Sequence, residues 1–327
     1  MNIVVVGLGS MGRRRIRLLK MISEDFNIIG IDSKQERRNR AEKELSIVTR
    51  DNLRDVLEEV HPDCAIVSTS PLAHADIIEM CLQANCHVFT ELNLVADKYD
   101  SNMNLAKKNN RVLFLSSTFL YRKEIQYINS IVKDKKEIIN YMYHVGQYLP
   151  DWHPWEDIRD YFVSDKATNG CRELLAIELP WISKVFGEIE SYKVVSGKNT
   201  MLPINYNDNY FLLLEHKGGS KGMIAVDVIS RKAVRNLEVY SENLYFTWDG
   251  TPDGLLMYDY TNKKEKTIQL YDSVDRQDGY ASFVIEDEYR NELETFLSLV
   301  EGKGVAEYTF EDDLKILNLI DEIEGDN

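Results

Sequence analysis

The feature that most constrains the fold is a glycine pattern at the start of the chain. In VVVGLGSMGRRRIRLLK, Gly7, Gly9 and Gly12 have the spacing GxGxxG, directly after an apolar run and directly before a helical pattern. The first glycine permits a tight turn, the second lets backbone approach a pyrophosphate, and the third allows close helix packing. Asp32 follows 20 residues after Gly12, at the end of the second apolar run. Strand, loop, helix and carboxylate together predict a dinucleotide-binding domain.

Asp32 also predicts which dinucleotide binds. A carboxylate there accepts a hydrogen bond from a ribose 2'-hydroxyl and repels a 2'-phosphate, so NAD is favoured over NADP. Polar and basic neighbours keep NADP open, since they could meet a phosphate: Ser33, Lys34, Arg37 and Arg38. We expect NADH to bind at least about tenfold more tightly than NADPH, a difference of about 1.4 kcal/mol.

Apolar runs and amphipathic stretches alternate through residues 1–120. The runs predict strands at 2–6, 27–32, 64–70, 87–91 and 111–117. Their continuous apolar character is typical of a parallel sheet covered on both faces. Helices are predicted over 51–60, with Asp51 as N-cap, and over 70–84, with Ser70 and Pro71 at its start. In HVFTELNLVADK, residues 87–98, the strand should lead into the start of another helix. We therefore predict an N-terminal Rossmann domain, a doubly wound parallel α/β sheet, over 1–120.

The pattern changes after residue 121. A helix is expected over 123–133, and alternating apolar and polar runs between 189 and 270 predict a large, mostly antiparallel sheet with one wetted face. Two helices should close the chain, over 283–301 and 311–324. Residues 121–327 are thus expected to form a C-terminal α+β domain for substrate and oligomer contacts.

Composition excludes several classes. A chain of 327 residues exceeds the usual size of one core, and a net charge of -15 argues against nucleic-acid binding. The basic runs Arg13-Arg14-Arg15 and Arg37-Arg38 are expected to be solvated helix faces. No run of 18 apolar residues and no charged segment before the first apolar run are present, so we expect a cytoplasmic protein without a membrane span. Four cysteines without a CxxC pair predict neither a disulfide framework nor a metal site.

Order and spacing of motifs make the chain resemble the glucose-fructose oxidoreductase / inositol dehydrogenase family, written Gfo/Idh/MocA. The resemblance runs from VVVGLGSMG through IVSTSPLAHADIIEMCLQANCHVFTELNL and AKKNNRVLFLSSTFLYR to EYRNELETFLSLVEGKGVAEYTFEDDLKILNLID. It implies a Rossmann domain, a C-terminal domain whose open sheet often mediates homo-oligomers, and NAD(P)-dependent oxidation or reduction of a sugar, polyol or related carbonyl.

The resemblance also implies which residues lie along the cofactor. Ser10 and Met11 match the phosphate loop, and Glu91 matches a glutamate beside the cofactor. The turn along the dinucleotide corresponds to Thr69, Ser70, Pro71 and His74. From its sequence context alone, His74 could equally be a helix residue with a local hydrogen bond.

Two departures concern the proton-transfer groups of the family. Leu92 and Asn93 replace the lysine and proline that follow the glutamate, and Asn93 would then lie beside the cofactor. In TNGCRELLAIELPWISKVFG, counting back from Phe186-Gly187 puts Leu174 and Ile177 at or near the family's acidic and histidine positions. The usual lysine-and-histidine chemistry therefore lacks its residues.

Replacement groups are expected in residues 149–179, a stretch dense in aromatic and ionisable side chains. His153 could be an acid/base or a packed loop histidine, and Lys166 could supply an ammonium group or be a solvent lysine. Glu173 and Glu178 are the only carboxylates on the helical stretch and are candidate catalytic groups. Glu178 lies in an apolar context, where it is either functional or paired with Arg172 or Lys184. The tryptophans beside His153, Trp152 and Trp155, could bind a sugar face.

Three further residues are candidates near the substrate. Tyr121 could move a proton, and Arg122 and Arg172 could bind substrate; Tyr121 and Arg122 could instead serve interdomain packing. The main expectation is an NAD(P)-dependent oxidoreductase of a sugar or sugar derivative with a non-standard acid/base. The alternatives are a catalytically silent NAD-binding homologue with a sensor or partner role, or a reductase of a conjugated substrate similar to the biliverdin reductases.

Overall fold

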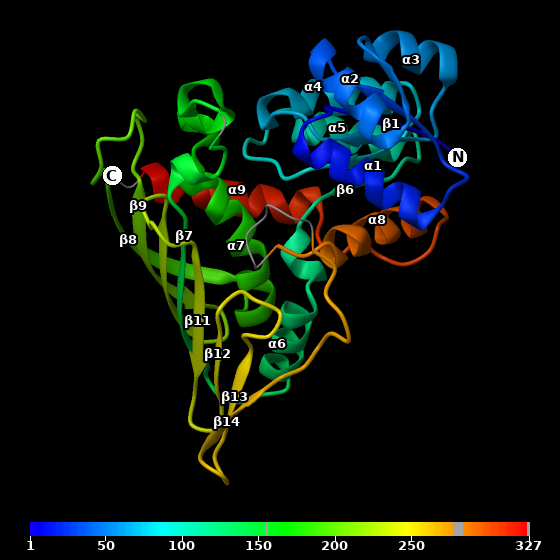
Figure 1. Ribbon diagram of the computed structural model, residues 1–327. Helices are drawn as coiled ribbons and strands as arrows, with labels where there is room; N and C mark the ends of the chain where they lie inside the picture. The colour runs from blue at the N-terminus through cyan, green and yellow to red at the C-terminus, as the bar shows by residue number, and fades with distance from the viewer. Residues whose placement is uncertain (155, 277–283, 326–327) are drawn as a thin grey trace. The chain divides into compact units, whose positions relative to one another are not determined.

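The protein is described by a computed structural model that covers residues 1–154, 156–276 and 284–325 (Figure 1). The chain divides into two compact units: unit 1 is Met1–Thr118 with Tyr289–Leu317, and unit 2 is Phe119–Glu288 with Asn318–Asn327. Sequence patterns assigned all residues after 120 to the second domain. The segment 289–317 groups with unit 1 because its side chains bond residues of that unit, as when Glu292 accepts the Ser117 N–H at 2.7 Å.

Unit 1 contains a six-stranded sheet in the order β3-β2-β1-β4-β5-β6, in which every neighbouring pair is parallel. Its strands are β1 Asn2–Val6, β2 Asn27–Ile31, β3 Val48–Arg50, β4 Cys64–Val67, β5 His87–Thr90 and β6 Leu113–Leu115. Its helices are α1 Ser10–Ile22, α2 Gln35–Leu45, α3 Leu53–Val60, α4 Pro71–Gln83 and α5 Tyr99–Lys108. The strand order reverses direction between β1 and β4, as in a doubly wound Rossmann fold. The predicted fold class is confirmed for this unit.

Two local predictions in unit 1 are wrong, the N-cap of α3 and the helix start expected after β5. The N-cap of α3 is Asn52, whose side chain accepts the Arg54 N–H at 3.0 Å, and not Asp51. The stretch HVFTELNLVADK does not run from strand into helix, since β5 ends at Thr90 and α5 begins only at Tyr99. Residues 91–98 between them are irregular, and Lys98 has the positive φ of a left-handed residue. This segment therefore lines the carboxyl edge of the sheet as a loop.

Unit 2 contains an eight-stranded sheet in the order β14-β13-β12-β11-β7-β10-β9-β8, antiparallel except for the parallel pair β7 and β10. This confirms the predicted large, mostly antiparallel sheet. Its strands are β7 Asn140–Gly146, β8 Ile189–Gly197, β9 Asn209–His216, β10 Lys221–Asp227, β11 Val234–Tyr240, β12 Tyr245–Trp248, β13 Leu256–Asp259 and β14 Lys264–Thr267. The helices are α6 Lys123–Lys133 and α7 Gly170–Phe186; η1 Thr118–Tyr121, α8 Asp287–Val300 and α9 Phe310–Gly325 contribute to both units.

The two faces of this sheet differ. Strand residues such as Tyr143, Leu212 and Ile224 are buried on the face that packs against α7, while Phe211, Leu213 and others on the opposite face are exposed. Before α7, residues 149–168 form four short 3-10 turns: η2 Leu149–Asp151, η3 Ile158–Asp160, η4 Phe162–Ser164 and η5 Lys166–Thr168. Among the described residues, none of the helices has the length and apolar character needed to cross a membrane.

Candidate active site

The glycine loop of unit 1 has the geometry that a dinucleotide requires. Gly7 has a φ of +93°, and a Cβ on it would lie 2.4 Å from the carbonyl oxygen of Ser68. A Cβ on Gly12 would lie 1.8 Å from the carbonyl oxygen of Gly7. By contrast, no described atom comes within 4 Å of a Cβ built on Gly9, which is the N-cap of α1. Since no described side chain caps α1, its first N–H groups are available to an anion.

Asp32 lies directly after β2, beside that loop. Its Oδ2 accepts the Leu8 N–H at 2.9 Å, and its Oδ1 accepts the Lys34 N–H at 2.8 Å. A carboxylate has about four lone-pair sites, so it can accept further hydrogen bonds from a ribose. Ser33 is exposed, and Arg37 Nη1 lies 3.7 Å from Asp32 Oδ2. The loop and this carboxylate therefore fit NAD, with Ser10 and Met11 in the first turn of α1.

The prediction that the two basic runs are solvated helix faces is wrong for three of their five residues. Arg14, Arg15 and Arg38 are only 2%, 0% and 9% exposed. Arg38 donates to the carbonyl oxygens of Asp32 and Ser33 at 2.6 and 3.0 Å, which stabilises the turn after β2. The partners of Arg15 come from distant segments, which a local basic run does not reveal.

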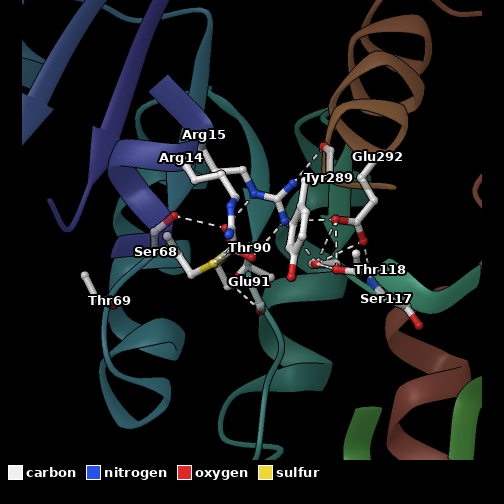
Figure 2. Close-up of polar contacts among 12 residues, drawn as sticks. Arg14, Arg15, Ser68, Thr69, Thr90, Glu91, Ser117, Thr118, Tyr289 and Glu292 are labelled. Atoms are coloured by element: carbon white, nitrogen blue, oxygen red, sulfur yellow. Dashed lines mark hydrogen bonds and ion pairs between the residues drawn. The ribbon is translucent and has the colours of Figure 1, made fainter. Parts of the chain in front are cut away.

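Arg15 joins two carboxylates near the carboxyl edge of the parallel sheet (Figure 2). Its Nε and Nη2 donate to the two oxygens of Glu91 at 2.7 and 2.9 Å, directly after β5. Its Nη2 also donates to Glu292 Oε2 at 2.8 Å, and its Nη1 to the carbonyl oxygen of Tyr289 at 2.9 Å. Burial opposes the charge of Arg15, but the two carboxylates outweigh it and raise the pKa of Arg15.

Glu292 and Glu91 differ in exposure. The Glu292 side chain is fully buried, and its Oε1 accepts the Ser117 N–H at 2.7 Å while Oε2 accepts the Thr118 hydroxyl at 3.2 Å. Burial raises the pKa of Glu292. The Glu91 side chain is 13% exposed and accepts the Ser68 hydroxyl at 3.2 Å. Glu91 is thus the carboxylate of this cluster that reaches the surface.

His74 connects the turn after β4 with the segment after β5. It is buried, with Nε2 3.1 Å from the Thr69 carbonyl oxygen and Nδ1 2.7 Å from Asn93 Oδ1. Burial lowers the pKa of His74. Ser70 is exposed, and Pro71 begins α4. The local hydrogen bonds of His74 hold Asn93 in place, and direct contact of these residues with the cofactor stays a prediction.

In unit 2, the first turn of α7 carries a carboxyl group with one unsatisfied oxygen. Glu173 is half-buried, and its Oε2 is inaccessible and has no hydrogen-bond partner among the described residues. Burial raises the pKa of Glu173 to about 7. Asn169 fixes the start of this helix because its side chain accepts the Arg172 N–H at 2.8 Å. Glu173 can therefore take up or release a proton near neutral pH.

His153 belongs to the same neighbourhood. Its ring stacks on Tyr161 with 4.0 Å between centroids, and its Nδ1 lies 3.2 Å from Glu156 Oε2. Burial raises the pKa of Tyr161, and the charges of Glu173 and Glu156 raise it further. We call His153, Glu156, Tyr161 and Glu173 the α7 cluster. Sequence reasoning missed Glu156 and Tyr161, although the spacing of Glu156 three residues after His153 was a signal.

Two other candidates from the same stretch are among the described residues. Trp152 is half-buried and donates its Nε1–H to the carbonyl oxygen of Gln147 at 3.2 Å. Lys166 is exposed in η5. Trp155 lies outside the described residues. Their proposed contacts with a substrate stay predictions.

Glu178 lies in the interior between α7 and the sheet. It accepts the Tyr143 hydroxyl at 2.7 Å and the Trp181 Nε1–H at 2.6 Å, and it pairs with Arg235 of β11. Its cation therefore comes from the sheet and is neither of the two basic residues on its own helix that the sequence suggested. Three donors occupy this carboxylate, which favours the paired interpretation of Glu178 over a role in proton transfer.

The remaining candidates are also buried within unit 2. Arg172 is 5% exposed and pairs with two carboxylates of α9 at 2.6 and 2.5 Å. Tyr121 is 5% exposed. Arg122 is 1% exposed and donates to Glu124 Oε1 at 2.8 Å. Roles of these residues at a substrate stay predictions.

The fold and the loop geometry define a Rossmann-type protein that fits a dinucleotide. Residues 1–117 match the family model GFO_IDH_MocA, described as an oxidoreductase family with an NAD-binding Rossmann fold. A Thermotoga maritima protein named myo-inositol 2-dehydrogenase is 24% identical over 320 residues, which cover 92% of this chain and 89% of that protein. Residues 1–117 thus match the Gfo/Idh/MocA family that the motifs predicted, and the similarity to a named dehydrogenase extends over nearly the whole chain.

Solved structures share this fold over nearly the whole chain. Levoglucosan dehydrogenase in complex with NADH has a TM-score of 0.80 and 13% identity, with 100% of this chain and 96% of that chain covered. UDP-N-acetylglucosamine 3-dehydrogenase from Acidithiobacillus ferrooxidans has a TM-score of 0.74 and 16% identity, with 99% and 97% covered. At these identities the likeness concerns the fold alone.

Proposed function

We propose that this oxidoreductase acts on a sugar or sugar derivative at a hydroxyl or carbonyl carbon, with Glu173 as the group that moves the oxygen-bound proton. The relatives named above act, by their names, on inositol, levoglucosan and a nucleotide sugar, which supports a polyhydroxylated substrate. The observation that carries the role of Glu173 is its partly buried carboxyl group, with one oxygen lacking a partner and a pKa raised to about 7.

The chemistry requires one hydride and one proton. NAD, when bound, accepts or supplies the hydride at its nicotinamide ring. In the oxidation direction, the substrate O–H bond breaks and its proton goes to the Glu173 carboxylate, while the C–H electron pair leaves as hydride and a C=O bond forms. A base with a pKa near the working pH is best suited to this transfer. Leu92, at the position of the family's lysine, has no ionisable group and cannot take this role.

The test compares Glu173→Gln with His153→Asn. We expect Glu173→Gln to lower kcat by roughly 10²-fold or more and to leave NADH affinity unchanged, because the amide cannot accept the proton. Wild-type kcat/KM for oxidation should rise with pH around 7, and this rise should be lost in the variant. If His153→Asn gave the larger loss, or if Glu173→Gln kept full activity, the assignment to Glu173 would be wrong.

We further propose that the outer face of the unit 2 sheet packs against a second copy of the chain. Leu213, Met223 and Met142 are neighbours across β9, β10 and β7, and they are 55%, 45% and 36% exposed. Lys193 continues this row at one end and Glu238 at the other. A two-fold axis along the strands would reverse the row, so that each Lys193 meets the partner's Glu238.

A further observation fits this proposal. The same face is hollowed by a cavity of about 940 Å³ lined by Met142, Phe211 and Met223. Contiguous apolar exposure of this kind is typical of an interaction surface.

We also place the protein in the cytoplasm, because its four cysteines are buried free thiols, which suit a reducing compartment.

A further inference from the structure

We infer that Arg15 is a positioning residue of the cofactor site, which holds the Glu91 carboxylate in one orientation and is itself held by Glu292. This inference concerns cofactor binding, and so it goes beyond the proton transfer assigned to Glu173. Figure 2 shows the guanidinium of Arg15 between the two carboxylates, with each of the three side chains coming from a different part of unit 1.

The contact between Arg15 and Glu91 fixes direction as well as distance. Two N–H groups, from Nε and Nη2, donate to the two carboxylate oxygens at 2.7 and 2.9 Å. Such a bidentate pair fixes the plane of the carboxylate, which a single ammonium group cannot do. Lysine at this position would keep the charge but lose the orientation.

Glu292 holds Arg15 from the other side. The side chains of Arg15 and Glu292 are both fully buried, and they meet at 2.8 Å. The Arg15 guanidinium also lies over the Phe89 ring, 4.5 Å from its centroid. A buried charge that loses its partner is strongly destabilised, so this arrangement has one stable geometry. The cluster is thus a rigid support with one partly exposed carboxylate, that of Glu91.

Glu91 lies where a dinucleotide bound to this fold ends. It follows β5 at the carboxyl edge of the sheet, and ligands of doubly wound sheets bind outside the carboxyl ends of the strands. It accepts the hydroxyl of Ser68, whose N–H donates to the carbonyl oxygen of Val6, directly before the Gly7 turn, at 2.8 Å. A carboxylate only accepts hydrogen bonds, so Glu91 suits a hydroxyl or amide donor of the cofactor.

The test replaces arginine by lysine at two positions, Arg15 and Arg111, whose partners lie at opposite ends of β5. Arg15→Lys should weaken NADH binding by roughly tenfold, the effect of about one charge-assisted hydrogen bond. Arg111 lies at the amino end of the same strand, where its Nη1 is 3.1 Å from His87 Nε2. Arg111→Lys should therefore leave NADH affinity unchanged. Fluorescence titration with NADH measures both, and the melting temperature of each variant shows whether it is folded.

A double-mutant cycle distinguishes positioning from a general structural role. If Arg15 acts through Glu91, Arg15→Lys should change NADH affinity less than twofold in a Glu91→Gln background. Unchanged affinity in Arg15→Lys alone, or an equal loss with and without Glu91, would overturn the inference. If Arg15→Lys does not fold, Glu292→Gln takes its place in the same cycle. We expect Glu292→Gln to lower NADH affinity roughly threefold, and to have no such effect in the Glu91→Gln background. These binding measurements do not depend on Glu173, so the two proposals fail separately.

Discussion

We propose that one carboxylate, Asp32, determines which dinucleotide this chain prefers. It lies beside the phosphate loop, and Arg37 is its half-exposed neighbour at 3.7 Å. Asp32→Ser should remove the repulsion of a 2'-phosphate and free Arg37 to meet it. We expect the ratio of NADPH to NADH affinity to rise by at least about tenfold, measured by fluorescence titration. A wild-type protein that already binds NADPH more tightly than NADH would contradict this assignment.

Residues differ in how far the sequence reveals their roles. Gly7, Gly9, Gly12 and Asp32 were predicted because one local pattern contains them all. Arg15 was expected to be solvated, since its partner Glu292 is 277 residues away in the chain. Glu173 was a candidate from the sequence. The sequence could not show that its Oε2 lacks a hydrogen-bond partner, because the surroundings of this atom depend on which segments fold over α7.

The pKa of Glu173 also predicts how stability depends on pH. The folded pKa of about 7 lies above the ordinary value of 4.5, so folding favours the protonated form. The free energy of unfolding should therefore fall as pH rises from about 4.5 through about 7, where the folded state must hold an ionised carboxylate. Glu173→Gln should remove this part of the slope in denaturant titrations. An identical pH dependence in both proteins would argue against the buried carboxyl group.

The turn from β1 into α1 predicts different outcomes for alanine substitutions at its two glycines, Gly9 and Gly12. A Cβ on Gly9 meets no described atom, so Gly9→Ala should keep its melting temperature but lose NADH affinity by roughly tenfold or more, since the methyl group occupies space meant for a pyrophosphate. A Cβ on Gly12 would lie 1.8 Å from backbone, so Gly12→Ala should be destabilised. Normal NADH binding by Gly9→Ala would contradict the assignment of this loop.

Helices and strands were predictable where the apolar pattern extended over many residues. The central strands and α4 followed from continuous apolar runs and a Ser-Pro start, whereas β3 has only three residues and left no clear pattern. Sequence patterns do not predict the short 3-10 turns between residues 149 and 168, nor the stacking of His153 on Tyr161. Ring stacking of this kind depends on tertiary contacts and not on a sequence period.

At the scale of the whole molecule, the exposed face of the eight-stranded sheet predicts the oligomeric state. Met223 lies in the middle of the exposed apolar row, so Met223→Glu should place two like charges close together at a two-fold interface. We expect wild type to sediment as a dimer or larger assembly and Met223→Glu to shift towards monomer, with unchanged circular dichroism. A monomeric wild type at micromolar concentration would contradict the proposal.

The domain organisation was predictable only in outline. Both sheets were expected, but the segment 289–317 groups with the Rossmann unit, and only its contacts show this. Glu292 and Asp313 both bond side chains of that unit, the latter with the Tyr99 hydroxyl. No local property of these C-terminal helices indicates to which of the two units they belong.

We propose that this chain is an active sugar oxidoreductase in which a group on α7 replaces the lysine of the family. The most direct test incubates the NADH-loaded protein anaerobically with a panel of sugar-derived carbonyls, nucleotide sugars and ketoacids. We predict loss of reduced-nicotinamide absorbance with a sugar-derived carbonyl, at a rate at least about 10²-fold lower in Glu173→Gln. Stable absorbance with every compound would contradict the proposed oxidoreductase activity and favour a catalytically silent NAD-binding homologue.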